Sequence, residues 1–318
     1  MNGKMIIEHN KVKGCFLGLA IGDALGVPVE FSEREQWRRA PVKEMLGFRV
    51  WNQPPGTWSD DSSLAFCLAE SLVNGYDVED IGVKSVNWLY EGYWGAHHKV
   101  FDVGNTTKLA LSRIRSGKSA KHSGEWDEAS NGNGSLMKIA PAALYFHNTD
   151  DDQLWIAISE ISSITHAHFR SCFCCFVYCK YLIELYKGEE KLEALRKASE
   201  SIRQLMDSKN FSTTETQLLD RILTLKIADA EEDEIKSSGY VLHTLEASIW
   251  CLLTTSSYKE AVLKAVNLGG DTDTTACVTG ALAGVYYGVE QIPGEWVDVL
   301  ARREDIVDLA KRFYKAKG

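Results

Sequence analysis

The chain has 318 residues, of which 45% are hydrophobic and 25% are charged, and this composition is typical of a globular protein with a substantial buried core. Its formal net charge of -9 argues against a nucleic-acid-binding surface, because such a surface needs clustered basic side chains. The longest apolar run, residues 15–29, is interrupted by Asp23 and is too short to cross a bilayer, so we expect no membrane partner.

Apolar side chains recur with helical spacing along almost the whole chain, whereas the alternation typical of strands is scarce. In chain order, the spacing predicts helices over residues 14–26, 61–73, 106–116, 135–146, 151–164, 169–186, 191–206, 214–230, 241–253, 258–266, 274–287 and 296–315. Asp77 is expected to cap a further helix that carries Ile81, Val86, Leu89 and Tyr90.

Glycine and proline positions support this helical interpretation. In the first predicted helix, Gly18, Gly22 and Gly26 share one face, so another backbone can approach it closely. All six prolines lie in predicted loops or near predicted helix ends, where the missing N–H costs little. The sequence therefore predicts one all-α domain over residues 1–318.

Residues 269–274 (Gly-Gly-Asp-Thr-Asp-Thr) form the more informative of two acidic segments. The glycines permit a sharp turn, after which Asp271, Asp273 and the Thr274 hydroxyl can converge on one point. Hard divalent cations prefer such all-oxygen ligands. The alternative is that one aspartate simply caps the helix that follows. A cap accounts for one aspartate but not for two, so the segment favours a metal site.

Residues 59–62 (Ser-Asp-Asp-Ser) form the second acidic segment, also at a predicted helix start. Taken alone, Ser59 or Asp60 could be an ordinary N-cap. Gathering several carboxylates in one place is costly unless cations compensate them. Together the two segments therefore predict a shared two-metal centre, which can orient a substrate hydroxyl and generate a nucleophilic water.

Four motifs in order resemble those of the ADP-ribosylglycohydrolase family, which includes dinitrogenase reductase-activating glycohydrolases and crystallin J1-like proteins. The motifs are residues 22–26 (Gly-Asp-Ala-Leu-Gly) followed by Glu30, residues 58–62, residues 132–141 (Gly-Asn-Gly-Ser-Leu-Met-Lys-Ile-Ala-Pro) and residues 269–274. The resemblance runs from about residue 12 to about residue 290, nearly the whole chain. Each motif alone is weak evidence, whereas four in the same order are specific.

The resemblance implies a compact orthogonal multi-helix bundle with a cleft that holds two Mg²⁺ or Mn²⁺ ions. It implies hydrolysis of the bond between C1″ of ADP-ribose and an acceptor on a protein or another conjugate, with ADP-ribose as product. By motif match the expected metal ligands are Ser59, Asp60, Asp61, Asp271, Asp273 and Thr274. Asp60 and Asp273 are also expected to be catalytic, together with Glu30, which would handle a proton.

The substrate contacts are less sharply defined. A glycine-containing loop before a predicted helix is expected to cradle the diphosphate, the alternative being a plain loop, and its residues are Asn131, Gly132, Asn133, Gly134 and Ser135. By resemblance, Asp102 is expected beside the distal ribose and His166 at the cleft. The nearby cysteines at 172, 174, 175 and 179 lie in an apolar run and are interpreted as core residues rather than metal ligands.

Several properties stay open at this point. Any of four loop tryptophans (Trp51, Trp58, Trp94 and Trp126) could stack on adenine. The acceptor could be arginine, serine, a nucleobase or a metabolite, and a catalytically silent, crystallin-like member is the alternative to an enzyme. Eight cysteines and a polar start over residues 1–13, without a signal-peptide pattern, predict a reducing cytoplasm. We expect a monomer.

Overall fold

In the computed structural model, which describes residues 3–317, the protein is a bundle of α-helices. No strand forms within this part of the chain, where the only β contacts are two isolated bridges. The helices are α1 (Gly3–Gly26), α2 (Arg34–Arg39), α3 (Asp60–Leu72), α4 (Val78–Glu91), α5 (Asn105–Arg115), α6 (Ala140–Tyr145), α7 (Asp151–Ser163), α8 (Phe169–Lys187), α9 (Lys191–Lys209), α10 (Thr213–Thr216), α11 (Asp220–Leu223), α12 (Val241–Leu253), α13 (Tyr258–Asn267), α14 (Thr272–Tyr287), α15 (Gly294–Val299) and α16 (Arg303–Lys317). The all-α prediction is confirmed.

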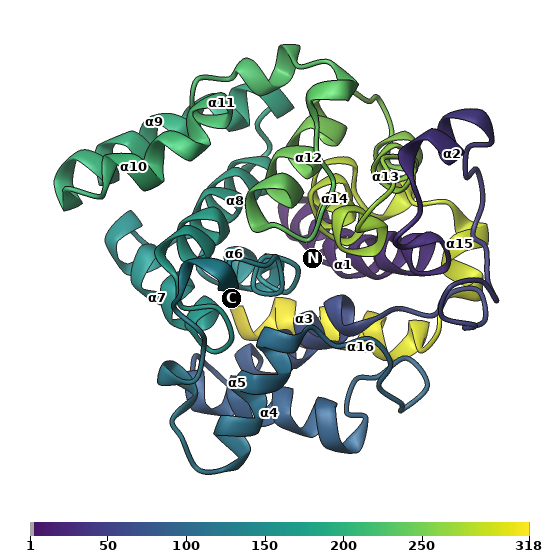
Figure 1. Ribbon diagram of the computed structural model, residues 1–318, viewed down its shortest axis with the longest axis horizontal. Coiled ribbons are helices and arrows are strands. Elements are labelled where there is room, and N and C mark those ends of the chain that lie inside the picture. Colours follow the sequence, from purple (N-terminus) through teal and green to yellow (C-terminus); the bar gives the residue numbers. More distant parts are fainter. Residues whose placement is uncertain (1–2, 318) are drawn as a thin grey trace.

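Helices α1 and α14 pack against each other through the middle of the molecule (Figure 1). Their backbones touch, because a Cβ atom added at Gly18 would lie 2.3 Å from the Gly280 carbonyl oxygen. At the end of α1, a Cβ atom at Gly26 would lie 2.3 Å from the Cα atom of Asp273. The predicted close approach of a second backbone is therefore confirmed, and it brings the start of α14 against the end of α1.

Helix boundaries differ from the prediction where the chain adopts special backbone conformations. The predicted helix over 214–230 is divided into short pieces, with Leu225 in the left-handed region at φ 65°. The predicted helix over 296–315 is likewise broken, and Arg302 has φ 48°. Helix α6 begins at Ala140 rather than at Ser135, because Pro141 has no N–H and fits only the first turn. The short helix α2 was not predicted.

Helix α1 is longer than predicted, and this removes one argument against a membrane span. The segment 5–29 is long and apolar enough to cross a membrane, with a mean hydropathy of 1.5 over an 18-residue window. However, 94% of that window is buried inside the protein. A helix that is apolar on all sides and surrounded by other helices is accounted for as a core helix.

Candidate active site

Asp23, on α1, fixes the start of α3, where the first acidic segment lies. Its Oδ1 accepts a hydrogen bond from the Ser59 backbone N–H at 2.8 Å. Its Oδ2 accepts from the Ser62 backbone N–H at 3.0 Å and from the Ser62 hydroxyl at 2.6 Å. Ser59 is the N-cap, and its hydroxyl accepts from the Asp61 N–H at 3.3 Å. The carboxylate on α1 therefore holds the helix turn that presents Asp60 and Asp61.

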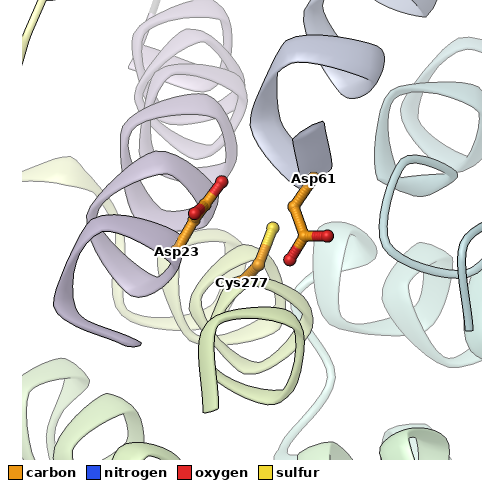
Figure 2. A group of neighbouring side chains, drawn as sticks. All are labelled: Asp23, Asp61 and Cys277. Carbon is orange, nitrogen blue, oxygen red and sulfur yellow. The ribbon is translucent and has the colours of Figure 1, made fainter. Parts of the chain in front are cut away.

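Figure 2 shows Asp23, Asp61 and Cys277 converging from α1, α3 and α14. One ligand atom of each lies within 4.8 Å of the others, yet this group suits a hard cation poorly. Burial raises the pKa of the Cys277 thiol, and the neighbouring carboxylates raise it further, so the sulfur stays protonated. Both Asp23 oxygens are already occupied by the donors at the start of α3. We interpret the group as structural support for Asp61.

The second acidic segment enters α14 through two glycines in the left-handed conformation. Gly269 and Gly270 both have φ 70°, and Gly270 exchanges backbone hydrogen bonds of 2.7 and 2.8 Å with Phe31 and Ser32. Asp271 occupies the N-cap position of α14 but makes no side-chain capping bond. The structure therefore removes the alternative that Asp271 is present as an ordinary helix cap.

The two acidic segments meet, although they are more than 200 residues apart. The Thr274 hydroxyl lies 3.3 Å from Asp61 Oδ1 and donates to it. Asp61 Oδ2 and Asp271 Oδ1 are buried and have no hydrogen-bond partner within the described chain. None of the ion pairs formed by residues 3–317 includes an aspartate of either segment. Burial raises the pKa of Asp60, Asp61 and Asp273, and neighbouring carboxylates add to the shift.

A second group of oxygen ligands adjoins this meeting point. Carboxylate oxygens of Glu30, Asp102 and Asp273 lie within 4.8 Å of one another. Burial raises the pKa of Glu30 to about 8, and the negative charge of Asp102 adds to the shift. Trp51 opposes it, because its indole Nε1 donates to Glu30 Oε2 at 2.5 Å. Burial raises the pKa of Asp102 to about 6, and the residue has φ 50°, in the left-handed region. Orphaned, buried carboxylate oxygens without compensating cations are the donor set that a divalent ion fits.

A cavity of about 250 Å³ opens at this carboxylate group. It is lined by most of the predicted site residues, namely Glu30, Asp60, Asp61, Asp102, Gly132, Asn133, Gly134, His166, Asp271 and Thr274. Four predicted site residues do not line it: Ser59, Asn131, Ser135 and Asp273. Ser59 serves as the cap of α3, whereas Asp273 lies beside the cavity in the group with Glu30 and Asp102.

The glycine loop forms one side of the cavity without a helix N-terminus behind it. Residues 134–138 form turns, and α6 starts only at Ala140, so the expected supply of free helix N–H groups is absent from this loop. Asn133 joins the loop to the acidic segment, because its Nδ2 donates to Asp271 Oδ2 at 2.9 Å. Asn131 instead faces the protein, where its Oδ1 accepts from Ser171. Ser135 is fully buried.

The structure distinguishes the four tryptophans that could stack on a ligand. Trp58 and Trp94 are buried in the core, with 0% and 4% of their surface exposed, so neither can stack on a ligand. Trp126 is 77% exposed on the surface. Trp51 contacts Glu30 directly, a role that the sequence did not indicate because the two residues lie in different loops. Asp23 was also missed as a supporting residue; its signal was a lone carboxylate inside an apolar helix.

The protein is thus a helical bundle with a carboxylate-rich cavity. The model of the ADP-ribosylglycohydrolase family matches residues 5–318. The chain is 32% identical over 311 residues to the ADP-ribosylarginine hydrolase Tri1 of Pseudomonas putida (strain GB-1), covering 96% of this chain and 78% of that protein. It is 29% identical over 297 residues to the ADP-ribosyl-(dinitrogen reductase) glycohydrolase of Rhodospirillum rubrum, covering 92% and 90%.

A solved structure described as an ADP-ribosylglycohydrolase-related protein complex superimposes with a TM-score of 0.81. Its sequence is 33% identical, and the match covers 98% of this chain and 99% of that one. The chain belongs to the ADP-ribosylglycohydrolase family, as the four sequence motifs predicted.

Proposed function

We propose that this protein hydrolyses the C1″ bond between ADP-ribose and an arginine side chain of a modified protein, and so reverses ADP-ribosylation. The observation that carries the proposal is the meeting of Asp61, Asp271 and Thr274 at one cavity, with two buried carboxylate oxygens left without partners. Membership of the ADP-ribosylglycohydrolase family and the similarity to ADP-ribosylarginine hydrolases support the same reaction.

We propose that two divalent cations, Mg²⁺ or Mn²⁺, bind between the acidic segments. The donor set consists only of hard oxygen atoms, and the candidate ligands are Ser59, Asp60, Asp61, Asp271, Asp273 and Thr274. When bound, such ions would hold the ribose hydroxyls and activate a water for attack on C1″. The same positive charges would lower the raised pKa values of the surrounding carboxyl groups.

Glu30 is suited to handle the proton that departure of the acceptor requires. Its carboxyl group lines the cavity, and in the metal-free protein burial favours its protonated form. Because the Trp51 indole occupies Oε2, the other carboxyl oxygen remains available to exchange a proton with the substrate. The hydrogen bond from Trp51 therefore fixes the orientation of the Glu30 carboxyl group as well as its position. The glycine loop and His166 form the side of the cavity that would receive the diphosphate.

An aromatic rim, which we define as Phe31, Trp51 and Phe101, supports arginine as the acceptor. The ring centroids of Phe31 and Trp51 are 6.3 Å apart, and those of Trp51 and Phe101 are 5.8 Å apart. Phe31 is 68% exposed and has φ 62°, a conformation that costs roughly 1–2 kcal/mol for a residue other than glycine. Two backbone hydrogen bonds to Gly270 hold this loop.

A planar guanidinium group stacks well on such rings, and nearby carboxylates complement its charge. The rim adjoins Glu30, where the leaving acceptor must be protonated. A serine hydroxyl offers neither a positive charge nor a flat face to the rim. The aromatic rim therefore favours arginine over serine.

The test is a panel of peptides that carry ADP-ribose on arginine or on serine, together with an ADP-ribosylated oligonucleotide. Release of ADP-ribose is measured with Mg²⁺, with Mn²⁺ and with a chelator. We expect turnover of the arginine-linked peptide that depends on the added ion. Turnover of no substrate, with ADP-ribose still bound, would instead identify a catalytically silent family member. We further propose that the reaction takes place in the cytoplasm, since all eight cysteines are free thiols.

A further inference from the structure

Lys138 is a buried lysine close to the candidate active site. Only 2% of its surface is exposed, and no ion pair within residues 3–317 includes it. Its Nζ donates to the Thr165 hydroxyl oxygen at 2.8 Å, which is its single hydrogen bond to another side chain in the described structure. Burial lowers the pKa of Lys138 to about 8, while the charge of Asp60 opposes the shift. A buried ammonium group with one neutral partner is costly, so its presence needs an explanation.

The partners of Lys138 continue to His166. The Thr165 hydroxyl lies 2.9 Å from His166 Nδ1. An ammonium group can only donate, so the Thr165 oxygen accepts from Lys138 and its own proton needs an acceptor. Thr165 is fully buried, and His166 Nδ1 is the acceptor within reach. If Nδ1 carried a proton instead, the hydroxyl proton would be buried without a partner, which is unfavourable.

This direction of hydrogen bonding determines the state of the imidazole. With Nδ1 as acceptor, a neutral His166 must carry its proton on Nε2. Burial lowers the pKa of His166 to about 3, and the charge of Lys138 lowers it further, so the ring is neutral. The ring lies against the glycine loop: a Cβ atom at Gly134 would be 3.3 Å from Nε2, and one at Gly132 would be 3.6 Å from it. His166 also lines the cavity.

We propose that Lys138 and Thr165 are positioning residues that lock His166 as its Nε2–H tautomer. The locked ring would present a neutral hydrogen-bond donor to an anionic oxygen of the diphosphate beside Gly132 and Gly134. The series of hydrogen bonds from ammonium to hydroxyl to imidazole polarises each donor in turn. The buried charge of Lys138 therefore strengthens the bond that Nε2–H donates to the anion, without entering the cavity. The identity of the anion rests on the proposed function, whereas the tautomer of His166 does not depend on it.

The tautomer is measured directly by long-range ¹H–¹⁵N correlation NMR of ¹⁵N-histidine-labelled protein at pH 7. We expect His166 to show a protonated Nε2 and an unprotonated Nδ1. Thr165→Val removes the hydroxyl at nearly constant shape and should release the lock, giving a mixture or the Nδ1–H form. Thr165→Ser, which keeps the hydroxyl, should retain the wild-type signature. Lys138→Met should also shift the tautomer, and Lys138→Arg, which keeps a donor, should restore it.

Affinity for ADP-ribose with Mg²⁺ present tests the role of the lock. We expect Thr165→Val to weaken binding about tenfold, the loss of one hydrogen bond to a charged group. Thr216→Val, at another buried threonine far along the chain, is the matched control and should change neither the tautomer nor the affinity.

A wild-type His166 that carries its proton on Nδ1, or that is cationic at pH 7, would overturn the proposal. An unlocked Thr165→Val ring with unchanged ADP-ribose affinity would overturn the role in binding. Absence of ADP-ribose binding by the wild-type protein would instead contradict the proposed function, and the NMR measurement would still decide whether the lock exists.

Discussion

Replacing Asp23 by alanine tests whether this carboxylate on α1 holds the start of α3. The substitution removes the acceptor of three donors: the Ser59 N–H, the Ser62 N–H and the Ser62 hydroxyl. Both N–H groups belong to the N-terminal turn of α3 or its cap, where no helical carbonyl can accept from them. Asp23, Ser59 and Ser62 are all buried, so water cannot replace the lost carboxylate without entering the core.

The magnitude follows from these contacts. Each buried backbone donor left unsatisfied costs about 1–3 kcal/mol, so the two together cost about 2–6 kcal/mol. Removing a buried carboxyl offsets part of this loss, because burial raises the pKa of Asp23 to about 7 and so disfavours its charged form. We expect Asp23→Ala to lower the free energy of unfolding by about 3 kcal/mol.

Urea denaturation followed by circular dichroism at pH 7 measures this change. Ser62→Ala is the matched control, because it removes one hydroxyl donor and leaves both backbone bonds in place; it should cost about 1 kcal/mol. A loss below 1 kcal/mol for Asp23→Ala, or a larger loss for Ser62→Ala than for Asp23→Ala, would refute the reasoning.

Four further outcomes follow from the site and the core. Asp271→Asn should lower hydrolysis by more than about 100-fold with unchanged circular dichroism, since it removes a candidate metal ligand. Gly280→Ala should destabilise the protein by about 3 kcal/mol in urea denaturation, because its Cβ atom would lie 2.2 Å from the Gly18 carbonyl oxygen. Trp51→Phe, which keeps a ring but loses the N–H donor to Glu30, should reduce the kcat for the arginine-linked peptide about tenfold. In metal-free protein, the folded state holds protons on Glu30 and its neighbouring carboxyls more tightly than the unfolded state, so stability should fall as the pH rises from 5 to 8 in thermal denaturation, and Mg²⁺ should reduce this slope.

These outcomes can each be contradicted separately. Full turnover by an Asp271→Asn protein that binds no metal would exclude the two-metal mechanism. An unchanged denaturation midpoint for Gly280→Ala would show that α1 and α14 are not in backbone contact. An equal loss of activity on arginine-linked and serine-linked peptides in a Phe31→Ala protein would remove the aromatic rim as the acceptor site, because Trp51 rather than Phe31 makes the hydrogen bond to Glu30. Tyr90→Ala is the control. Tyr90 is an exposed aromatic residue on α4 whose ring contacts Arg115, at the end of α5, so this substitution should leave both activities unchanged.

The acidic segments could be recognised before the fold was known, because their information is local. Two carboxylates separated by one residue, after a pair of glycines, already suggest convergence on a cation. The same spacing could not decide between a ligand and a helix cap. That decision depends on the side-chain direction of Asp271, which makes no capping bond.

Other parts of the site depend on contacts between segments that are distant in sequence. Trp51 was one of four equivalent tryptophans until packing placed its indole against Glu30. The glycine loop was assigned a helix N-terminus that the structure does not provide, because Pro141 starts α6 later. The role proposed for Lys138 could be recognised only from its hydrogen bond to Thr165, which lies 27 positions further along the chain.

The sequence by itself determined the helical class, the glycine face of α1 and the two acidic segments. All of these follow from spacing along one helix or one turn, where neighbours in sequence are neighbours in space. Only the tertiary structure decided which carboxylates lack partners, which tryptophan meets Glu30 and which nitrogen of His166 lies against the Thr165 hydroxyl. The physical reason is that burial and hydrogen-bond pairing belong to the packed arrangement of distant segments, which no local pattern specifies.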